Sequence, residues 1–170
     1  MNSPFATIFL ALQQRIQAEV PTIVYIDQDL GQLRSKARPP VSWPCVLLDF
    51  EDFSFENLGE NVQTATGTVV LRLGFEPHSN SSQATPLPYI QQAIAYYDIE
   101  WALHKAIQGW SPATTLGSFS RTSAATQTRS DNYRVREIRY SIAFEDYSTK
   151  HEQLFAPAAL IVNEDIDLPL

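Results

Sequence analysis

The hydrophobic residues of this chain follow two periods, one of three to four residues and one of two. The first period begins after Ser3-Pro4 and predicts an amphipathic helix over residues 4–18, with Phe5, Ile8, Phe9, Leu12 and Ile16 on its apolar side. A longer helical pattern covers residues 88–109. Its main stripe consists of Ile90, Ile94, Tyr97 and Trp101, and Tyr96, Leu103 and Ile107 widen it. We expect these apolar sides to pack on a sheet.

The opposite side of the second predicted helix carries small residues. Ala95, Ile99, Ala102 and Ala106 recur there at steps of 4, 3 and 4 residues. Two interpretations stay open. Alanine is common on exposed helices because its helix propensity is high, and small side chains also let an element of a second subunit pack closely.

Alternation with a period of two predicts the strands. Residues 22–27 and 45–57 are rich in β-branched and aromatic residues, and we expect the second strand to bend near Asp52. Residues 66–77 alternate most regularly. Val69, Leu71, Leu73 and Phe75 share one side, and Thr68, Arg72 and Glu76 share the other, which is typical of an antiparallel strand with one side in water.

The last strand pattern, "NYRVREIRYSIAFED" over residues 132–146, changes its parity. Tyr133 and Val135 belong to one parity, whereas Ile138, Tyr140, Ile142 and Phe144 belong to the other. This change predicts a β-bulge near Arg136 and Glu137. The later four residues and the apolar side of residues 69–75 form the expected core, covered by Ile94, Tyr97 and Trp101.

The order of these elements predicts an α+β fold. We expect a mainly antiparallel sheet of about four to six strands, with the N-terminal helix and the longer central helix packed on one face. A length of 170 residues, 44% of them hydrophobic, is enough for a single domain over residues 1–170. Residues 155–170 read as an extended arm, and the order of the loops 31–44 and 111–131 stays open.

The charge of the chain limits its partners. The net charge of −7 repels phosphate backbones at long range, so nucleic-acid binding is expected to be weak. The basic residues are nevertheless clustered, and the region 121–139 holds Arg121, Arg129, Arg134, Arg136 and Arg139. This cluster is either a solvated face or a patch that grips an acidic partner.

The acidic arm is the natural complement of that cluster. Asp165 and Asp167 lie beside the apolar residues Ile166 and Leu168. An arm that lies on the arginine-bearing region of the next subunit would link copies head to tail. The alternative is an arm that folds back on its own subunit or stays disordered.

The residues that would support catalysis are sparse. The three histidines are scattered, and the single cysteine, Cys45, follows a proline at the start of a strand, as inert buried thiols do. Glu100 and His104 stand one helical turn apart, but a helical zinc motif needs two histidines and a further ligand. We expect no enzyme activity, no cofactor, no metal site and no membrane-spanning segment.

Residues 102–146 carry a resemblance to a known group of proteins. A helix that ends on "LHKAIQGW", a Ser-Arg-Thr segment, an Asp-Asn turn and a strand that ends on Phe-Glu-Asp together resemble small neck and tail-completion proteins of bacteriophages and prophages. The likeness is strongest to the tail-terminator group. It implies a homo-oligomeric ring, commonly a hexamer, that caps the head-proximal end of the tail tube and contacts the tube protein and the head connector. Such a protein belongs to the virion tail and to the host cytoplasm during assembly. The alternative is a small module whose basic loops contact nucleic acid.

Overall fold

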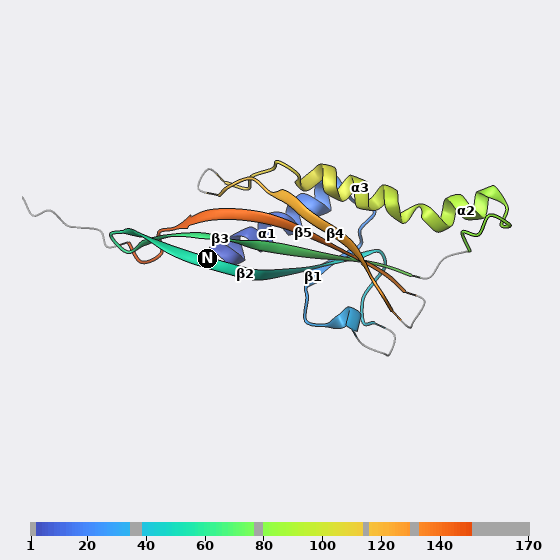
Figure 1. The fold of residues 1–170 in the computed structure, drawn as a ribbon, viewed down its shortest axis with the longest axis horizontal. Coiled ribbons are helices and arrows are strands. Elements are labelled where there is room, and N and C mark those ends of the chain that lie inside the picture. Colours follow the sequence, from blue (N-terminus) through green and yellow to red (C-terminus); the bar gives the residue numbers. More distant parts are fainter. Residues whose placement is uncertain (1–2, 35–38, 77–79, 114–115, 130–132, 151–170) are drawn as a thin grey trace, which may run out of the picture.

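The computed structural model describes residues 3–34, 39–76, 80–113, 116–129 and 133–150. These residues form three α-helices, one short 3-10 helix and five strands (Figure 1). The elements are α1 (Pro4–Glu19), β1 (Tyr25–Gln28), η1 (Gln32–Arg34), β2 (Cys45–Gly59), β3 (Val62–Phe75), α2 (Leu87–Ile94), α3 (Tyr96–Ile107), β4 (Ser120–Gln127) and β5 (Arg134–Asp146). The α+β prediction is therefore confirmed.

The five strands make one sheet in the order β1-β2-β3-β5-β4. Three of its four pairings are antiparallel, as expected, and β1 adds a parallel pairing to β2. A parallel pair needs a connection that crosses over, and here η1 lies on that connection. The region 111–131, expected as a loop of open order, contains β4, which pairs with β5.

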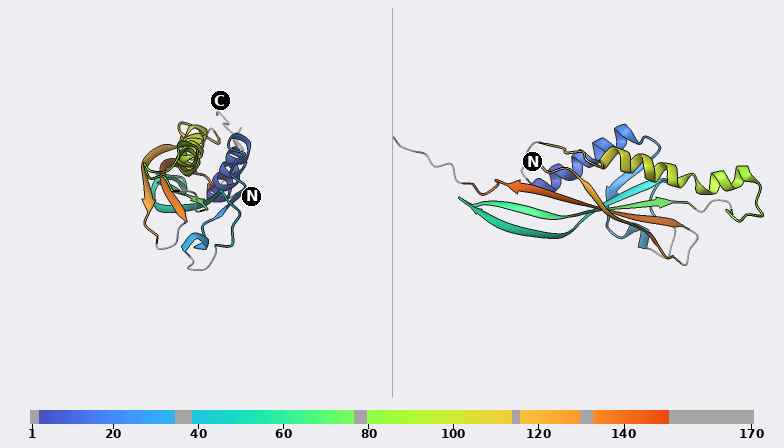
Figure 2. Two further views of the ribbon diagram at one scale, coloured as in Figure 1. Left: turned by 90° about the vertical axis from the view of Figure 1, so that its right-hand side faces the viewer. Right: turned by 45° about the horizontal axis from the view of Figure 1, so that its top comes forward.

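The face of the sheet under α1 and α3 holds the main core (Figure 2). The expected core residues of β3 and β5 are all buried there, which confirms that part of the prediction. Ile8, Leu12 and Ile16 of α1 join them at 0% exposure. The described length of α1 also agrees with the predicted helix.

The central helix is where the prediction is wrong. It consists of two helices joined at Ala95, and the predicted stripe does not cover the sheet, because Ile94, Tyr97 and Trp101 are 42%, 49% and 64% exposed. The side of α3 that faces the core is the other one, and it carries Tyr96, Glu100, Leu103, Ala106 and Ile107. A hydrophobic stripe on a helix predicts a contact surface, but it does not show whether the contact is made within the same chain or with another protein.

The second face of the sheet is covered as well, which corrects two further expectations. Val135 packs there with Leu33, Cys45 and Leu47 under the loop that carries η1. The change of parity in residues 133–144 therefore needs no bulge, and β5 pairs with β3 in continuous register from Arg134 to Asp146. Arg72, expected in water, is buried on this face at 5% exposure.

The bend expected near Asp52 is confirmed. The register of β2 against β3 shifts between Glu51 and Ser54, and Asp52 has a positive φ of 57°. The shift lets the ring of Phe53 lie over Gly67, where an added Cβ would meet it at 2.4 Å. Beyond this bulge, residues 52–66 form a hairpin that projects from the body, and its tip turns at Glu60 and Asn61 with φ near 51° and 61°, as in a type I′ turn.

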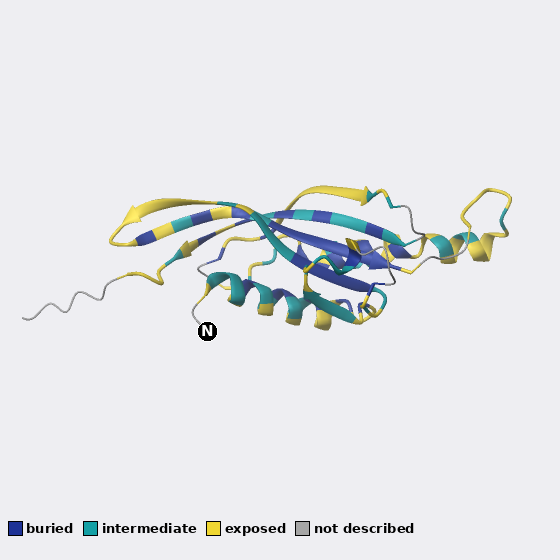
Figure 3. Cartoon of the chain, turned by 90° about the horizontal axis from the view of Figure 1, so that it is seen from below, coloured by how far each residue is buried: buried dark blue, intermediate teal, exposed yellow. Residues whose placement is uncertain are grey.

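The hairpin and α2 project from opposite ends of the long axis (Figures 1 and 2). The residues at both ends are mostly exposed, whereas the centre of the sheet is buried (Figure 3). No residue of α2 is buried. The described part of the chain thus has a packed middle and two projecting ends, although β3 still pairs with β5 along the hairpin as far as Gln63.

Candidate functional site

A cluster of charged residues lies on the second face of the sheet. Its centre is Arg72, whose side chain is 6% exposed and contacts four carboxylates. Nε donates to Glu137 at 3.2 Å and Nη2 donates to Glu51 at 2.9 Å. Nη1 donates to Asp29 and lies 3.6 Å from Asp49. We call Arg72, Asp29, Asp49, Glu51, Glu137 and Arg139 the Arg72 cluster.

Arg139 completes the cluster from β5. Its Nε donates to Glu137 at 2.9 Å and its Nη2 donates to Glu51 at 2.8 Å. Burial alone would lower the pKa of Arg72, but the hydrogen bonds to Glu51 and Asp29 raise it, so the guanidinium keeps its charge. Arg72 and Arg139 form ion pairs with the carboxylates of the cluster. The cluster therefore joins β2, β3 and β5 to Asp29, which follows β1.

The other clustered arginines of β5 are also bound within the chain. Arg136 makes a two-pronged ion pair with Glu100 of α3, at 2.6 and 2.8 Å. The guanidinium of Arg134 lies 4.4 Å above the centre of the Tyr96 ring. Glu100 thus serves a structural contact rather than a metal site. These pairings leave less of the cluster for phosphate groups than a count of arginines implies.

Arg121 lies at the start of β4, and Arg129 follows two residues after its end. Arg121 is exposed, and its backbone N–H donates to Gln108 at 2.9 Å. Arg129 donates to the carbonyl oxygen of Leu33. Asp165 and Asp167 lie outside the described residues, so the contact between the acidic arm and the arginines stays a prediction.

The small residues of the central helix pack mostly against their own chain. Ala106 belongs to the core, and Ile99 and Ala102 pack against it. Ala95 is exposed at the joint between α2 and α3. The side that faces outward is instead the apolar stripe of Leu87, Ile94, Tyr97 and Trp101, which is 42–64% exposed.

Within the described residues, two further candidates for chemistry are His104, which contacts a tyrosine, and Cys45, which is buried. His104 Nδ1 lies 3.1 Å from the hydroxyl of Tyr140, and burial, followed by the charge of Arg121, lowers the pKa of His104. Cys45 is buried as expected, and burial raises the pKa of its thiol to about 12. No cluster of metal-binding side chains occurs within the described ranges. Nor does any helix among the described residues have the length and apolarity to cross a membrane.

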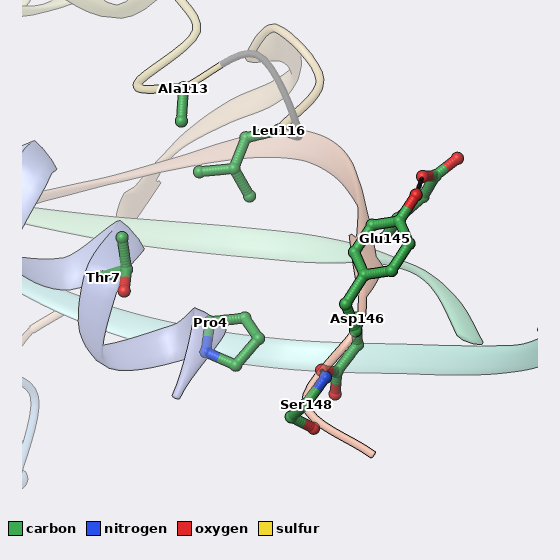
Figure 4. A pocket seen from close by; sticks show the side chains of 8 residues that line it. Pro4, Thr7, Ala113, Leu116, Glu145, Asp146 and Ser148 are labelled. Atoms are coloured by element: carbon green, nitrogen blue, oxygen red, sulfur yellow. Dashed lines mark hydrogen bonds between the residues drawn. The ribbon is translucent and has the colours of Figure 1, made fainter. Parts of the chain in front are cut away.

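An open pocket of about 240 Å³ lies where the start of α1 meets the end of β5 (Figure 4). Pro4 and Thr7 line one side, Leu116 lines another, and Glu145 and Asp146 line the third. The Glu145 carboxylate accepts a hydrogen bond from Tyr147, and that of Asp146 accepts one from the backbone of Ser148 at 2.9 Å. Both carboxylates of the pocket are therefore hydrogen-bonded to residues that lie close to them in the sequence.

The surface features that stand out are the two apolar ends. The stripe on α2 and α3 is one, and the projecting hairpin with Phe55 and Leu58, at 47% and 58% exposure, is the other. The sequence pattern did not single out the hairpin side chains, although "FSFENLG" places three apolar residues, Phe53, Phe55 and Leu58, among polar ones before a turn. Large exposed apolar side chains at projecting ends are typical of surfaces that contact other proteins.

The comparisons with known proteins add a shared fold. No family model matches the chain, and no curated protein matches it. Among solved structures it is similar to a chain of the virion of a native gene transfer agent particle, with a TM-score of 0.51 and 12% identity. The likeness covers 85% of this chain and 99% of that one. At this identity it shows that the two chains share a fold over nearly the whole length of the virion chain.

Proposed function

We propose that the protein is a non-enzymatic structural component of a phage-like particle, a tail terminator or tail-completion protein that acts as a ring at the head-proximal end of the tail. The observation that carries the proposal is the fold likeness, because it covers 99% of a chain that stands in a virion. The resemblance of residues 102–146 to tail-terminator proteins points to the same class and supplies the finer assignment.

The surface of the chain supports an assembly role. Both projecting ends expose large apolar side chains, and ordinary monomers keep such side chains scattered rather than gathered at two ends. The charged groups at the centre are paired with one another, which suits a rigid part better than a catalytic one. On this account the partners are further copies of the chain, the tail tube protein and the head connector.

Deletion of the gene from the element that encodes the protein tests the proposal. We expect filled heads without attached tails, and tails of variable length, because nothing stops polymerisation of the tube or joins it to the head. Negative-stain electron microscopy of induced lysates measures both features. A copy supplied in trans should restore uniform, head-attached tails.

A deletion strain that releases intact particles with tails of normal length contradicts the proposal. Lysates with normal tails and normal junctions but empty heads would also contradict it, since that result places the protein in packaging rather than in the tail.

A further inference from the structure

The apolar stripe on α2 and α3 lacks a cover within the chain. Leu87, Ile94, Tyr97 and Trp101 follow one another at steps of 7, 3 and 4 residues, which place them along one side of the two helices. Their exposed fractions are 64%, 42%, 49% and 64%. The opposite side of α3 already packs on the core, so the stripe points away from the body.

Cations border this stripe. The ammonium group of Lys105 lies 5.4 Å from the centre of the Trp101 ring, and the guanidinium of Arg134 lies 5.9 Å from that of Tyr97. The acidic residues of α3 are Asp98 and Glu100. The charge of Glu100 is paired with that of Arg136, which leaves Asp98 as the acidic residue beside the two cations. The border of the stripe is therefore positive on balance.

The projecting hairpin has the complementary character. Phe55 and Leu58 are its exposed apolar side chains, and Asp52, Glu56 and Glu60 are exposed acidic residues around them. No lysine, arginine or histidine occurs in residues 39–71, so nothing on this hairpin neutralises those carboxylates. An apolar tip with an acidic border matches an apolar stripe with a basic border.

The two surfaces lie at opposite ends of the long axis, so they do not meet within one copy (Figures 1 and 2). Between copies they can meet head to tail. A contact that joins two different surfaces repeats from copy to copy, and it closes into a ring when the rotation between neighbours allows. A contact of the stripe with a second stripe would instead stop at a two-fold dimer and would bring the bordering cations together.

We propose that the hairpin tip of one copy, with Phe55 and Leu58, docks on the stripe of the next copy at Tyr97 and Trp101, with Glu56 and Glu60 near Lys105 and Arg134. The occupant of the stripe is thus a second copy of this chain. The inference rests on the proposed function, which requires a ring, and adds the two surfaces that form it.

A mixing experiment with two variants tests the contact. Phe55→Glu spoils the hairpin and leaves the stripe intact, and Trp101→Glu does the reverse. Each variant alone should remain a monomer, because every contact needs both surfaces. An equal mixture should form a dimer of one copy of each, since one intact hairpin meets one intact stripe and the chain of contacts then ends. Sedimentation velocity and light scattering measure the masses.

Leu30→Glu is the matched control, because Leu30 is 78% exposed and lies on neither surface. It should assemble as the wild type does. Both test positions are exposed, so circular dichroism should show wild-type folding. A wild-type chain that stays monomeric at high concentration overturns the inference, as does either variant that assembles normally. A mixture that stays monomeric overturns the head-to-tail pairing.

The mixing experiment and the gene deletion test different claims, so either claim can be wrong while the other holds. If the deletion gives the expected headless tails while the mixture stays monomeric, the role in the tail stands and the surfaces are wrong. If the mixture dimerises while the deletion leaves particles intact, the contact is real and the assigned role is wrong.

Discussion

The two faces of the sheet are held in different ways. Under α1 and α3 the side chains are mostly apolar, as Leu71 illustrates at 0% exposure, and the ion pair of Glu100 with Arg136 is a charged contact beside them. On the other face a small apolar group under η1 adjoins the Arg72 cluster. The difference teaches that burial alone does not define a core, since one face gains stability by removing apolar area from water and the other depends on complete pairing of its charges.

The largest expected loss of stability comes from a cavity in the face of the sheet that the helices cover. Leu71→Ala should lower the free energy of unfolding by about 2–5 kcal/mol, because it leaves a cavity beneath α1 and α3. Denaturant titration followed by circular dichroism measures the change, and Gln63→Ala, on the exposed part of β3, is the control. A loss below about 0.5 kcal/mol would mean that the strand faces the other way.

A smaller loss of stability is expected from a change in the Arg72 cluster on the other face. Arg72→Met should cost about 1–3 kcal/mol, because the carboxylate of Asp29 loses its closest cation, while Glu137 keeps Arg139 and the more exposed Asp49 and Glu51 can turn toward water. The same titration checks it, with the exposed Arg121→Met as the control. If Arg72→Met unfolds at the wild-type midpoint, the cluster does not stabilise this face.

The pH dependence sharpens the role of the cluster further. Burial would raise the pKa of Glu137, but hydrogen bonds from Gln127 and Arg139 and the charge of Arg72 hold it below its ordinary value of 4.5. A lowered folded-state pKa stabilises the fold above the ordinary value, and this contribution is lost as the pH falls through the folded-state pKa. We expect the stability difference between wild type and Glu137→Gln to shrink below pH 4.5. Midpoints measured from pH 7 to pH 3 test this, and a constant difference would contradict it.

The smallest expected effect separates the two sides of α3. Trp101→Ala should change the free energy of unfolding by no more than about 0.5 kcal/mol, since the side chain is 64% exposed. Leu103→Ala, two residues away and fully buried, should cost about 2–5 kcal/mol. Titrations of the two variants give the order, and the reverse order would show that the predicted stripe packs on the sheet after all.

The sequence was sufficient for β1, β2, β3 and β5, though not for β4, and for the shared core of β3 and β5, because alternation along a strand assigns each residue to a face. It was insufficient for the second face. The change of parity at Val135 fits a strand whose second face is also buried, but it fits a β-bulge equally well. The contact of Leu33 with that face shows that the second face is buried. Arg72 appeared to belong in water because its carboxylate partners come from distant segments.

The outward stripe of α3 could not be assigned for a different reason. Both sides of residues 96–107 contain apolar residues, so the helical period allows either side to face the core. The choice follows from Glu100, whose pairing with Arg136 of β5 turns its own side toward the sheet. That ion pair spans 36 positions of sequence, and no local pattern reports it.

Immunogold electron microscopy of purified particles tests the central claim most directly. Antibodies raised against the purified protein should label a single site at the junction of head and tail, because the account places a ring at the head-proximal end of the tail tube. Label along the whole tail, label at its distal tip, or particles without label would contradict the account.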